Sequence, residues 1–244
     1  MPHSVRLAAA QAYIEYVADL LDSSTVDRQV EGSVAKLFAT ESGNLAADAA
    51  VGALGGYGYC VDYEVEKIRR DARILTIYEG TSEIQQNIIG VFRIRDNVRS
   101  KGKFYETLAA EVEGMTEVGG PAAARTARFL SEATIRAFRA KLTHQQFAVF
   151  EFATSMTEVE TAVALVRAAS RSDNALLKAQ ARIWASEIAL SVPTRLLSVL
   201  SSSGGLSTDD FETLKVLGNL DGALALQAGR FADLDFIAKT ITAD

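Results

Sequence analysis

Apolar residues in the first part of the chain recur at three- and four-residue intervals, the period of one face of an α-helix. The repeat consists of Leu7, Ala10, Ile14, Val17 and Leu21. This pattern predicts a first helix that ends near Asp22. Ser24 and Asp27 have the spacing of a capping box, so a second helix is expected to begin there and to run to Gly55 and Gly56.

The next segment is rich in glycine and then in polar residues. Residues 55–60, GGYGYC, favour a sharp turn, and a short helix is expected over residues 65–70. Thr81 or Ser82 is expected to cap the helix that follows, because both are good N-cap residues. Gln85 stands three residues after Ser82, where it would complete a second capping box.

A polar and basic stretch, RSKGK at residues 99–103, interrupts the apolar pattern. We interpret it as a linker between two domains, residues 1–98 and residues 104–244. Amphipathic patterns return beyond it and predict further helices, among them helices at residues 122–141 and 145–170.

Composition favours an all-α protein. Hydrophobic residues make up 48% of the 244 residues and proline occurs three times, so the commonest helix breaker is scarce. Pro193 is expected to kink or end the helix that contains it, because proline lacks an N–H donor and crowds the preceding turn.

Charge and reactive residues argue against several classes of function. The net charge is −6 with scattered Lys and Arg, which argues against nucleic acid as a partner. Cys60 is the single cysteine, which excludes an internal disulfide and suits a reducing compartment. His3 and His144 are the only histidines, too few for a zinc site or a Ser-His-Asp triad, so no metal is expected. We expect no signal peptide and no membrane-spanning helix, because the first twenty residues lack the signal-peptide pattern and no apolar run is read as long enough to cross a bilayer.

Residues 54–85, LGGYGYCVDYEVEKIRRDARILTIYEGTSEIQ, carry a specific combination of motifs. A glycine-rich turn, a Val-Glu-Lys helix, an Arg-Asp-Ala-Arg segment and a Tyr-Glu-Gly-Thr turn follow one another without a gap. This order resembles the C-terminal signature of the flavin-dependent acyl-CoA dehydrogenases. The resemblance implies an incomplete C-terminal helical bundle of that family, followed by a helical extension domain similar to that of the very-long-chain branch. Gly52, Glu64 and Gln86 depart from residues frequent in the family.

The resemblance assigns chemistry to the Tyr-Glu-Gly-Thr turn. Glu79 is implied as the catalytic base that removes the proton α to a thioester carbonyl, while FAD accepts the β-hydrogen as hydride. Tyr78 and Gly80 are implied as substrate-binding residues, with the Glu79 backbone N–H donating to the thioester oxygen. Taken alone, a glutamate before a helix is more often a capping or dipole-compensating acid, and that interpretation stays open.

Further residues are implied as ligands of FAD. Thr81 and Glu83 match positions near the flavin pyrophosphate and ribityl chain, at the amino end of a helix. Gly55 and Gly56 match the turn that meets the adenine end of a flavin bound mainly by a neighbouring subunit. Helix capping explains Thr81 and Glu83, and helix termination explains the two glycines, without any ligand.

The resemblance also implies partners and a setting. A fatty acyl-CoA substrate in fatty-acid β-oxidation, an electron-transfer flavoprotein and a homodimer are expected for the parent enzyme. The location would be cytoplasmic in a bacterium, or the mitochondrial matrix or inner-membrane face in a eukaryote. The flavin-binding N-terminal and β domains of the family are not recognisable here, so the alternative is a non-catalytic helical module for dimerisation or membrane docking. Its peripheral membrane contact would use the basic cluster Arg125, Arg128, Arg136, Arg139 and Lys141.

Overall fold

The computed structural model describes residues 2–242, and every regular element within them is helical. This confirms the all-α prediction. The first half contains α1 (Pro2–Ser23), α2 (Gln29–Leu54), α3 (Gly56–Tyr59), α4 (Glu64–Ile74) and α5 (Ser82–Arg99). The second half contains α6 (Lys103–Val112), α7 (Gly120–Arg139), α8 (Gln146–Ser170), α9 (Ala175–Ser202), α10 (Thr208–Gly218), α11 (Leu220–Ala225) and α12 (Arg230–Ile241), with short 3₁₀ turns at Thr116–Val118 and Leu142–His144.

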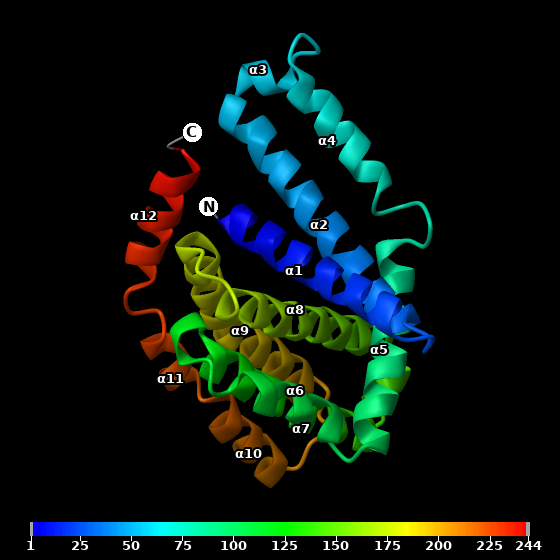
Figure 1. Cartoon of the computed structure of the whole chain (residues 1–244). Helices are drawn as coiled ribbons and strands as arrows, with labels where there is room; N and C mark the ends of the chain where they lie inside the picture. Colours follow the sequence, from blue (N-terminus) through cyan, green and yellow to red (C-terminus); the bar gives the residue numbers. More distant parts are fainter. Residues whose placement is uncertain (1, 243–244) are drawn as a thin grey trace.

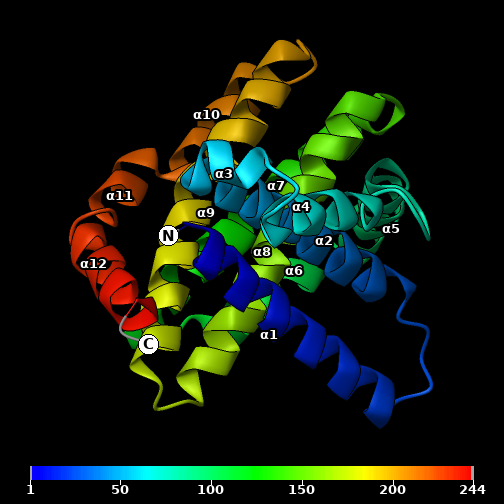
Figure 2. The same ribbon diagram turned by 90° about the horizontal axis from the view of Figure 1, so that it is seen from above.

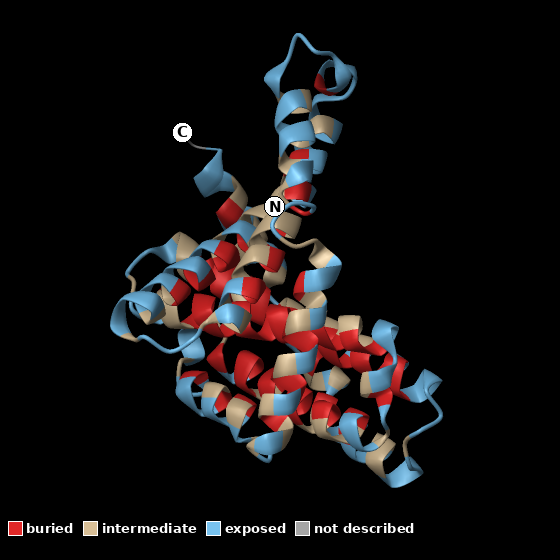
Figure 3. Ribbon diagram, turned by 90° about the vertical axis from the view of Figure 1, so that its right-hand side faces the viewer, coloured by how far each residue is buried: buried red, intermediate tan, exposed pale blue. Residues whose placement is uncertain are grey.

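The helices form a bundle from which an arm projects (Figure 1). The outer part of α2, with α3 and α4, makes this arm, and its outer end is almost entirely exposed (Figure 3). In the bundle, α8 packs against α1, α5 and α9, and α9 also packs against α7. The last three helices lie along one side of α9, which is clearest from above (Figure 2).

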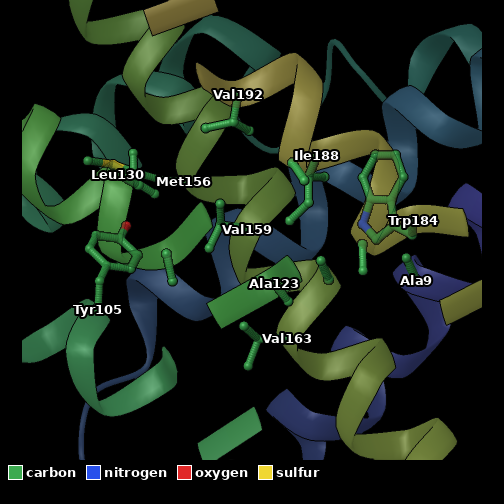
Figure 4. Close-up of a cluster of buried hydrophobic side chains, with 14 of the residues drawn as sticks. Ala9, Tyr105, Ala123, Leu130, Met156, Val159, Val163, Trp184, Ile188 and Val192 are labelled. Atoms are coloured by element: carbon green, nitrogen blue, oxygen red, sulfur yellow. The ribbon is translucent and has the colours of Figure 1, made fainter. Parts of the chain in front are cut away.

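One continuous cluster of buried side chains joins the two halves of the chain. Trp184 of α9, Tyr105 of α6 and Met156 of α8 are among its largest fully buried side chains (Figure 4). Small residues such as Ala9 and Ala123, both 0% exposed, let the helices approach closely. The core therefore crosses residues 99–103, where Lys101 and Gly102 form a tight turn with positive φ. The division into two domains stays a prediction.

Two capping predictions are wrong. Ser24 Oγ accepts from Val26 N and Asp27 Oδ1 accepts from Gln29 N, so these side chains close turns before α2 instead of capping a helix at Ser24. Thr81 is the N-cap of α5, as predicted, and its Oγ1 accepts from Ile84 N at 3.4 Å. Gln85, however, does not pair with Ser82, because its amide points back into the preceding turn.

Pro193 does not end its helix, contrary to one of the predicted outcomes. Helix α9 continues through it to Ser202. Pro193 is buried, and a Cβ on Gly218 of α10 would lie only 3.2 Å from its Cβ. Tertiary packing on α10 thus offsets the missing hydrogen bond, since context overrides local helix preference.

Contrary to the expectation that no apolar run reaches membrane length, helix α9 is long and apolar enough to cross a membrane, but 67% of its most apolar window is buried inside the bundle. A buried core helix meets the same criterion of length and composition, so this is weak evidence for a membrane span. Two of the five residues of the predicted basic cluster, Arg128 and Arg136, are neutralised by acidic partners. Arg128 pairs with Glu106 and Glu113, and Arg136 pairs with Glu132 and Asp210.

Candidate functional site

The candidate site is the turn that joins α4 to α5. The backbone N–H groups of Ile77 and Tyr78 both donate to Ile74 O, at 2.9 and 3.0 Å. Ser82 N then donates to Thr76 O at 3.1 Å, which closes the loop just as α5 begins. Thr76 is only 4% exposed and anchors the base of the turn.

Glu79 and Gly80 are consecutive residues in the left-handed region, with φ of +53° and +91°. This conformation is unfavourable for a residue with a Cβ, by roughly 1–2 kcal/mol. Gly80 is required for a second reason, because a Cβ there would lie 2.6 Å from Gln85 Nε2. An unfavourable backbone that the surroundings enforce is a reason to consider a functional role for Glu79.

Two side chains hold the carbonyl groups of this turn. Lys36 of α2 donates from Nζ to Gly80 O at 2.6 Å. Gln85 of α5, which is 7% exposed, donates from Nε2 to Glu79 O at 3.2 Å and to Gly80 O at 3.3 Å. Both carbonyls therefore point into the bundle, and the Glu79 side chain is exposed.

The other face of the turn presents backbone donors. Within residues 2–242, the N–H groups of Glu79, Gly80 and Thr81 donate to no protein acceptor. They lie at the amino end of α5, where the helix dipole favours negative charge. This run of N–H groups is suited to an anionic or strongly polarised oxygen of a ligand.

Polar side chains at the start of α5 are also fixed. The Ser82 hydroxyl donates to Glu41 of α2. Hydrogen bonds from its own backbone N–H, and then from the Thr81 hydroxyl, lower the pKa of Glu83 below the usual range. Glu83 therefore stays ionised at neutral pH. An ionised carboxylate is a poor direct ligand for phosphate, so any phosphate contact there would come from backbone and Thr81 groups.

A cavity of about 390 Å³ lies beside this end of α5, between α1, α2 and α8. Arg6 lines it and stacks on the rings of Phe38 and Trp184, at 4.7 and 5.2 Å from their centroids. Burial lowers the pKa of Arg6, although the nearby Glu158 opposes the shift. Helix α8 belongs to the second half of the chain, which therefore supplies one wall of the space next to the candidate site.

Five of the predicted site residues lie together in the turn and the first residues of α5. They are Tyr78, Glu79, Gly80, Thr81 and Glu83. Gly55 and Gly56 do not join them. They lie at the outer end of the arm, and α4 separates them from the turn (Figure 1). Gly55 has φ +58°, and a Cβ on either glycine would meet no atom within 4 Å, so the tip leaves open space. Tyr57 and Tyr63 stack there with centroids 5.1 Å apart.

Sequence reasoning missed Lys36 and Glu41 and gave Gln85 the wrong partner. Lys36 and Glu41 precede the turn by more than thirty residues, and no local motif marks them. Only the packing of α2 against α5 brings them to the turn. No group of His, Cys, Asp and Glu suited to a metal ion occurs in the part of the chain that the structure describes.

Comparisons with known proteins point to one family. Residues 3–92 match the family described as acyl-CoA dehydrogenase, C-terminal domain. The caffeyl-CoA reductase-Etf complex subunit CarC of Acetobacterium woodii is 42% identical over 86 residues, which cover 35% of this chain and 22% of that protein. The 3-methylmercaptopropionyl-CoA dehydrogenase of Ruegeria pomeroyi is 43% identical over 138 residues, which cover 56% of this chain and 21% of that protein.

A solved structure shares the fold over nearly the whole chain. The acyl-CoA dehydrogenase complexed with FAD from Bacillus anthracis superposes with a TM-score of 0.73 and covers 98% of this chain, at 16% sequence identity. The match covers 48% of that protein, and the chain spans about a fifth of the length of the two curated relatives. The arrangement of α6 to α12 on α1 to α5 thus has a counterpart of known structure.

Proposed function

We propose that this chain is part of a flavin-dependent acyl-CoA oxidoreductase in which Glu79 is the catalytic base, because residues 3–92 match the C-terminal domain of the acyl-CoA dehydrogenases. One observation supports this most strongly. Glu79 is held in a left-handed turn by Lys36 and Gln85, so that its carboxylate and its free backbone N–H both face outward. A rigid base beside a free donor is what α-proton abstraction from a thioester needs.

The roles of the chain's own groups follow from this geometry. The Glu79 carboxylate takes the proton α to the thioester carbonyl, and the Glu79 N–H donates to the carbonyl oxygen as negative charge develops there. Gly80 leaves the approach to this N–H free of a side chain, and Tyr78, which is 50% exposed, flanks the same opening. The exposed Glu79 carboxylate needs a drier environment to act near neutral pH, so further atoms must cover it when substrate binds.

The residues at the start of α5 fit one end of FAD. When bound, FAD accepts the β-hydrogen as hydride. The free N–H groups of Gly80 and Thr81 would hold anionic or polar atoms of the cofactor. Gly55 and Gly56 would meet a second flavin, because they lie apart from Glu79 at the exposed arm tip. Open space surrounds both glycines, which leaves room for such a group to approach the backbone.

The names of two relatives bear on the direction of the reaction and on the electron-transfer partner. One is a dehydrogenase and another a reductase-Etf complex subunit, so either direction of the reaction is compatible with the turn. We place the parent enzyme in fatty-acid β-oxidation, with a fatty acyl-CoA substrate, an electron-transfer flavoprotein as partner and a homodimeric assembly. A cytoplasmic location in a bacterium is part of the same proposal.

The test is Glu79→Gln in the complete enzyme that contains this chain. Flavin should stay bound, because the backbone donors of the turn are unchanged, whereas bleaching of the flavin by palmitoyl-CoA should be lost. Glu64→Gln is the matched control, since it also removes an exposed carboxylate, at the start of α4 and away from the turn, and it should retain bleaching. Normal bleaching by the Glu79 variant would remove Glu79 from its role.

A second function is favoured by the exposure of the arm. The tip carries Tyr59 and Val61 at 84% and 83% exposure, as expected of a helical module that docks on another protein surface. Gel filtration of the 244-residue chain with added FAD separates the two functions. Retention of flavin supports a catalytic site within the chain, and a flavin-free dimer supports a docking module.

A further inference from the structure

A second cavity lies on α5, toward the end opposite the Glu79 turn. Helix α5 runs away from the arm (Figure 1), and the cavity occupies its C-terminal half, beside the end of α7 and the start of α8. Its volume is about 420 Å³, which is within the usual range for small-molecule sites. The apolar side chains that line it are Val91, Ile94, Val98, Phe138 and Val149.

The cavity opens to solvent through apolar groups that the bundle leaves uncovered. Val91 is 47% exposed and Phe138 is 48% exposed. Helices α5 and α8 pack closely at the base of the cavity, because a Cβ on Gly90 would lie 2.5 Å from Val149 Cγ1. The groove is therefore a formed feature of the α5–α8 contact with an apolar interior, rather than a gap between mobile side chains.

The charged groups at the groove are all cations. Arg95 and Arg99 line it one helical turn apart, and no acidic side chain lines it among the residues described. Arg95 stacks on Phe92 at 4.3 Å and meets Asp96 only at 3.8 Å. Arg99 has no ion pair or hydrogen-bond partner on its side chain within residues 2–242. Their guanidinium groups are thus available to an anion at one end of an apolar groove.

We propose that this groove binds a single-chain amphiphile with an anionic head, a fatty carboxylate, with the chain along Val91, Ile94 and Phe138 and the carboxylate at Arg95 and Arg99. Charge complementarity selects this occupant. A guanidinium pair matches the planar, bidentate geometry of a carboxylate, and the apolar lining matches a hydrocarbon chain. The inference does not rest on the role of Glu79, which lies at the other end of α5.

Two properties of the ligand follow from this arrangement. Each added methylene that enters the groove should tighten binding about fourfold, until the groove is full. A cationic amphiphile of equal chain length should bind at least tenfold more weakly, because Arg95 and Arg99 would repel its head group.

The experiment is titration calorimetry of the 244-residue chain with octanoate, decanoate and dodecanoate, below their micellar concentrations, and with dodecyltrimethylammonium. Arg95→Gln/Arg99→Gln should weaken dodecanoate binding about tenfold or more. Val91→Trp, at an exposed position, should fill the groove and abolish the dependence on chain length. Far-UV circular dichroism confirms that each variant is folded.

Arg171→Gln is the matched control. Arg171 is also an exposed arginine at a helix end, without a side-chain partner in the described part of the chain. It follows α8 at the end opposite Val149, roughly 33 Å away at 1.5 Å per residue. This variant should bind dodecanoate like the unchanged chain.

The outcomes distinguish a fatty chain in this groove from one bound at the Glu79 turn and from a groove covered by protein. Unaltered dodecanoate binding in both groove variants overturns the proposal, as does equal affinity for the cationic amphiphile. Binding that Glu79→Gln weakens and the groove variants do not would place the fatty chain at the Glu79 turn instead. A concentration-dependent dimer that the Val91 variant disrupts, without any dodecanoate binding, would show that a second copy covers the groove.

Discussion

The most informative perturbation of the fold is Glu160→Gln, at the centre of a buried polar cluster. Glu160 of α8 is 5% exposed and accepts two hydrogen bonds from Arg93 of α5, at 2.7 Å from Nε and 3.0 Å from Nη2. Tyr13 of α1 donates to the same carboxylate at 2.8 Å, and Tyr105 of α6 lies at 3.5 Å. One side chain therefore connects four helices from both halves of the chain.

The expected loss in the free energy of unfolding follows from the burial of Arg93, the ion-pair partner of Glu160. Burial alone would lower the pKa of Arg93, but the charge and hydrogen bonds of Glu160 outweigh it and raise the pKa, so the guanidinium stays charged. Removing the opposite charge leaves that cation in the core, which costs about 3–5 kcal/mol. Glu31 also meets Arg93 Nη2, at 3.1 Å, and this remaining carboxylate places the expected loss at the lower end, about 3 kcal/mol.

The assay is urea denaturation followed by circular dichroism at 222 nm, with the free energy of unfolding extrapolated to water. Glu212→Gln is the control, because its partner Lys215 lies on an exposed helix face, and its loss should be below about 1 kcal/mol. Replacing the buried pair together, as Arg93→Met/Glu160→Leu, should recover part of the stability lost in the single variant, and the remaining loss comes from the Tyr13 hydroxyl, which then lacks its acceptor.

Two results would refute the reasoning. A Glu160→Gln protein within 1 kcal/mol of the unchanged chain would show that Arg93 finds water or another partner when Glu160 is neutral. A double variant as unstable as the single one would show that the loss comes from packing rather than from the unpaired charge.

Local structure was predictable wherever short-range chemistry determines it. Thr81 caps α5 because its side chain and the helix N–H groups lie within one turn, and the apolar period of the first helix is visible in the sequence. The helix through Pro193 was not predictable, since its stability comes from burial against α10, which is distant in sequence. The capping-box prediction for Ser24 and Asp27 was wrong because serine and aspartate side chains also close turns.

In the candidate site, too, the residues close in sequence were predictable and those brought in by tertiary packing were not. The Tyr-Glu-Gly-Thr motif located the turn, and its four residues and Glu83 are close in space because they are close in sequence. Lys36, which determines where the Gly80 carbonyl points, is reached only through the packing of α2 on α5. Glu160 is similar, because a glutamate within an apolar helix pattern does not reveal that Arg93 and Tyr13 converge on it.

Two further predictions concern the turn and the buried tyrosines. Gly80→Ala should lower the free energy of unfolding by about 1–2 kcal/mol, because φ is +91° and the new Cβ would meet Gln85 Nε2; Gly56→Ala, in open space without positive φ, should change it little. Burial, and then the charge of Glu160, raise the pKa of Tyr13 and of Tyr105 well above the usual value near 10. A raised pKa in the folded state means that the folded protein holds these protons more tightly. The resulting stability is fully present below pH 10 and is lost as pH rises above that value toward the folded pKa. Urea denaturation at pH 9 and pH 11 should therefore show a fall that Tyr13→Phe/Tyr105→Phe reduces, and an equal fall in both proteins would assign the alkaline instability to other groups.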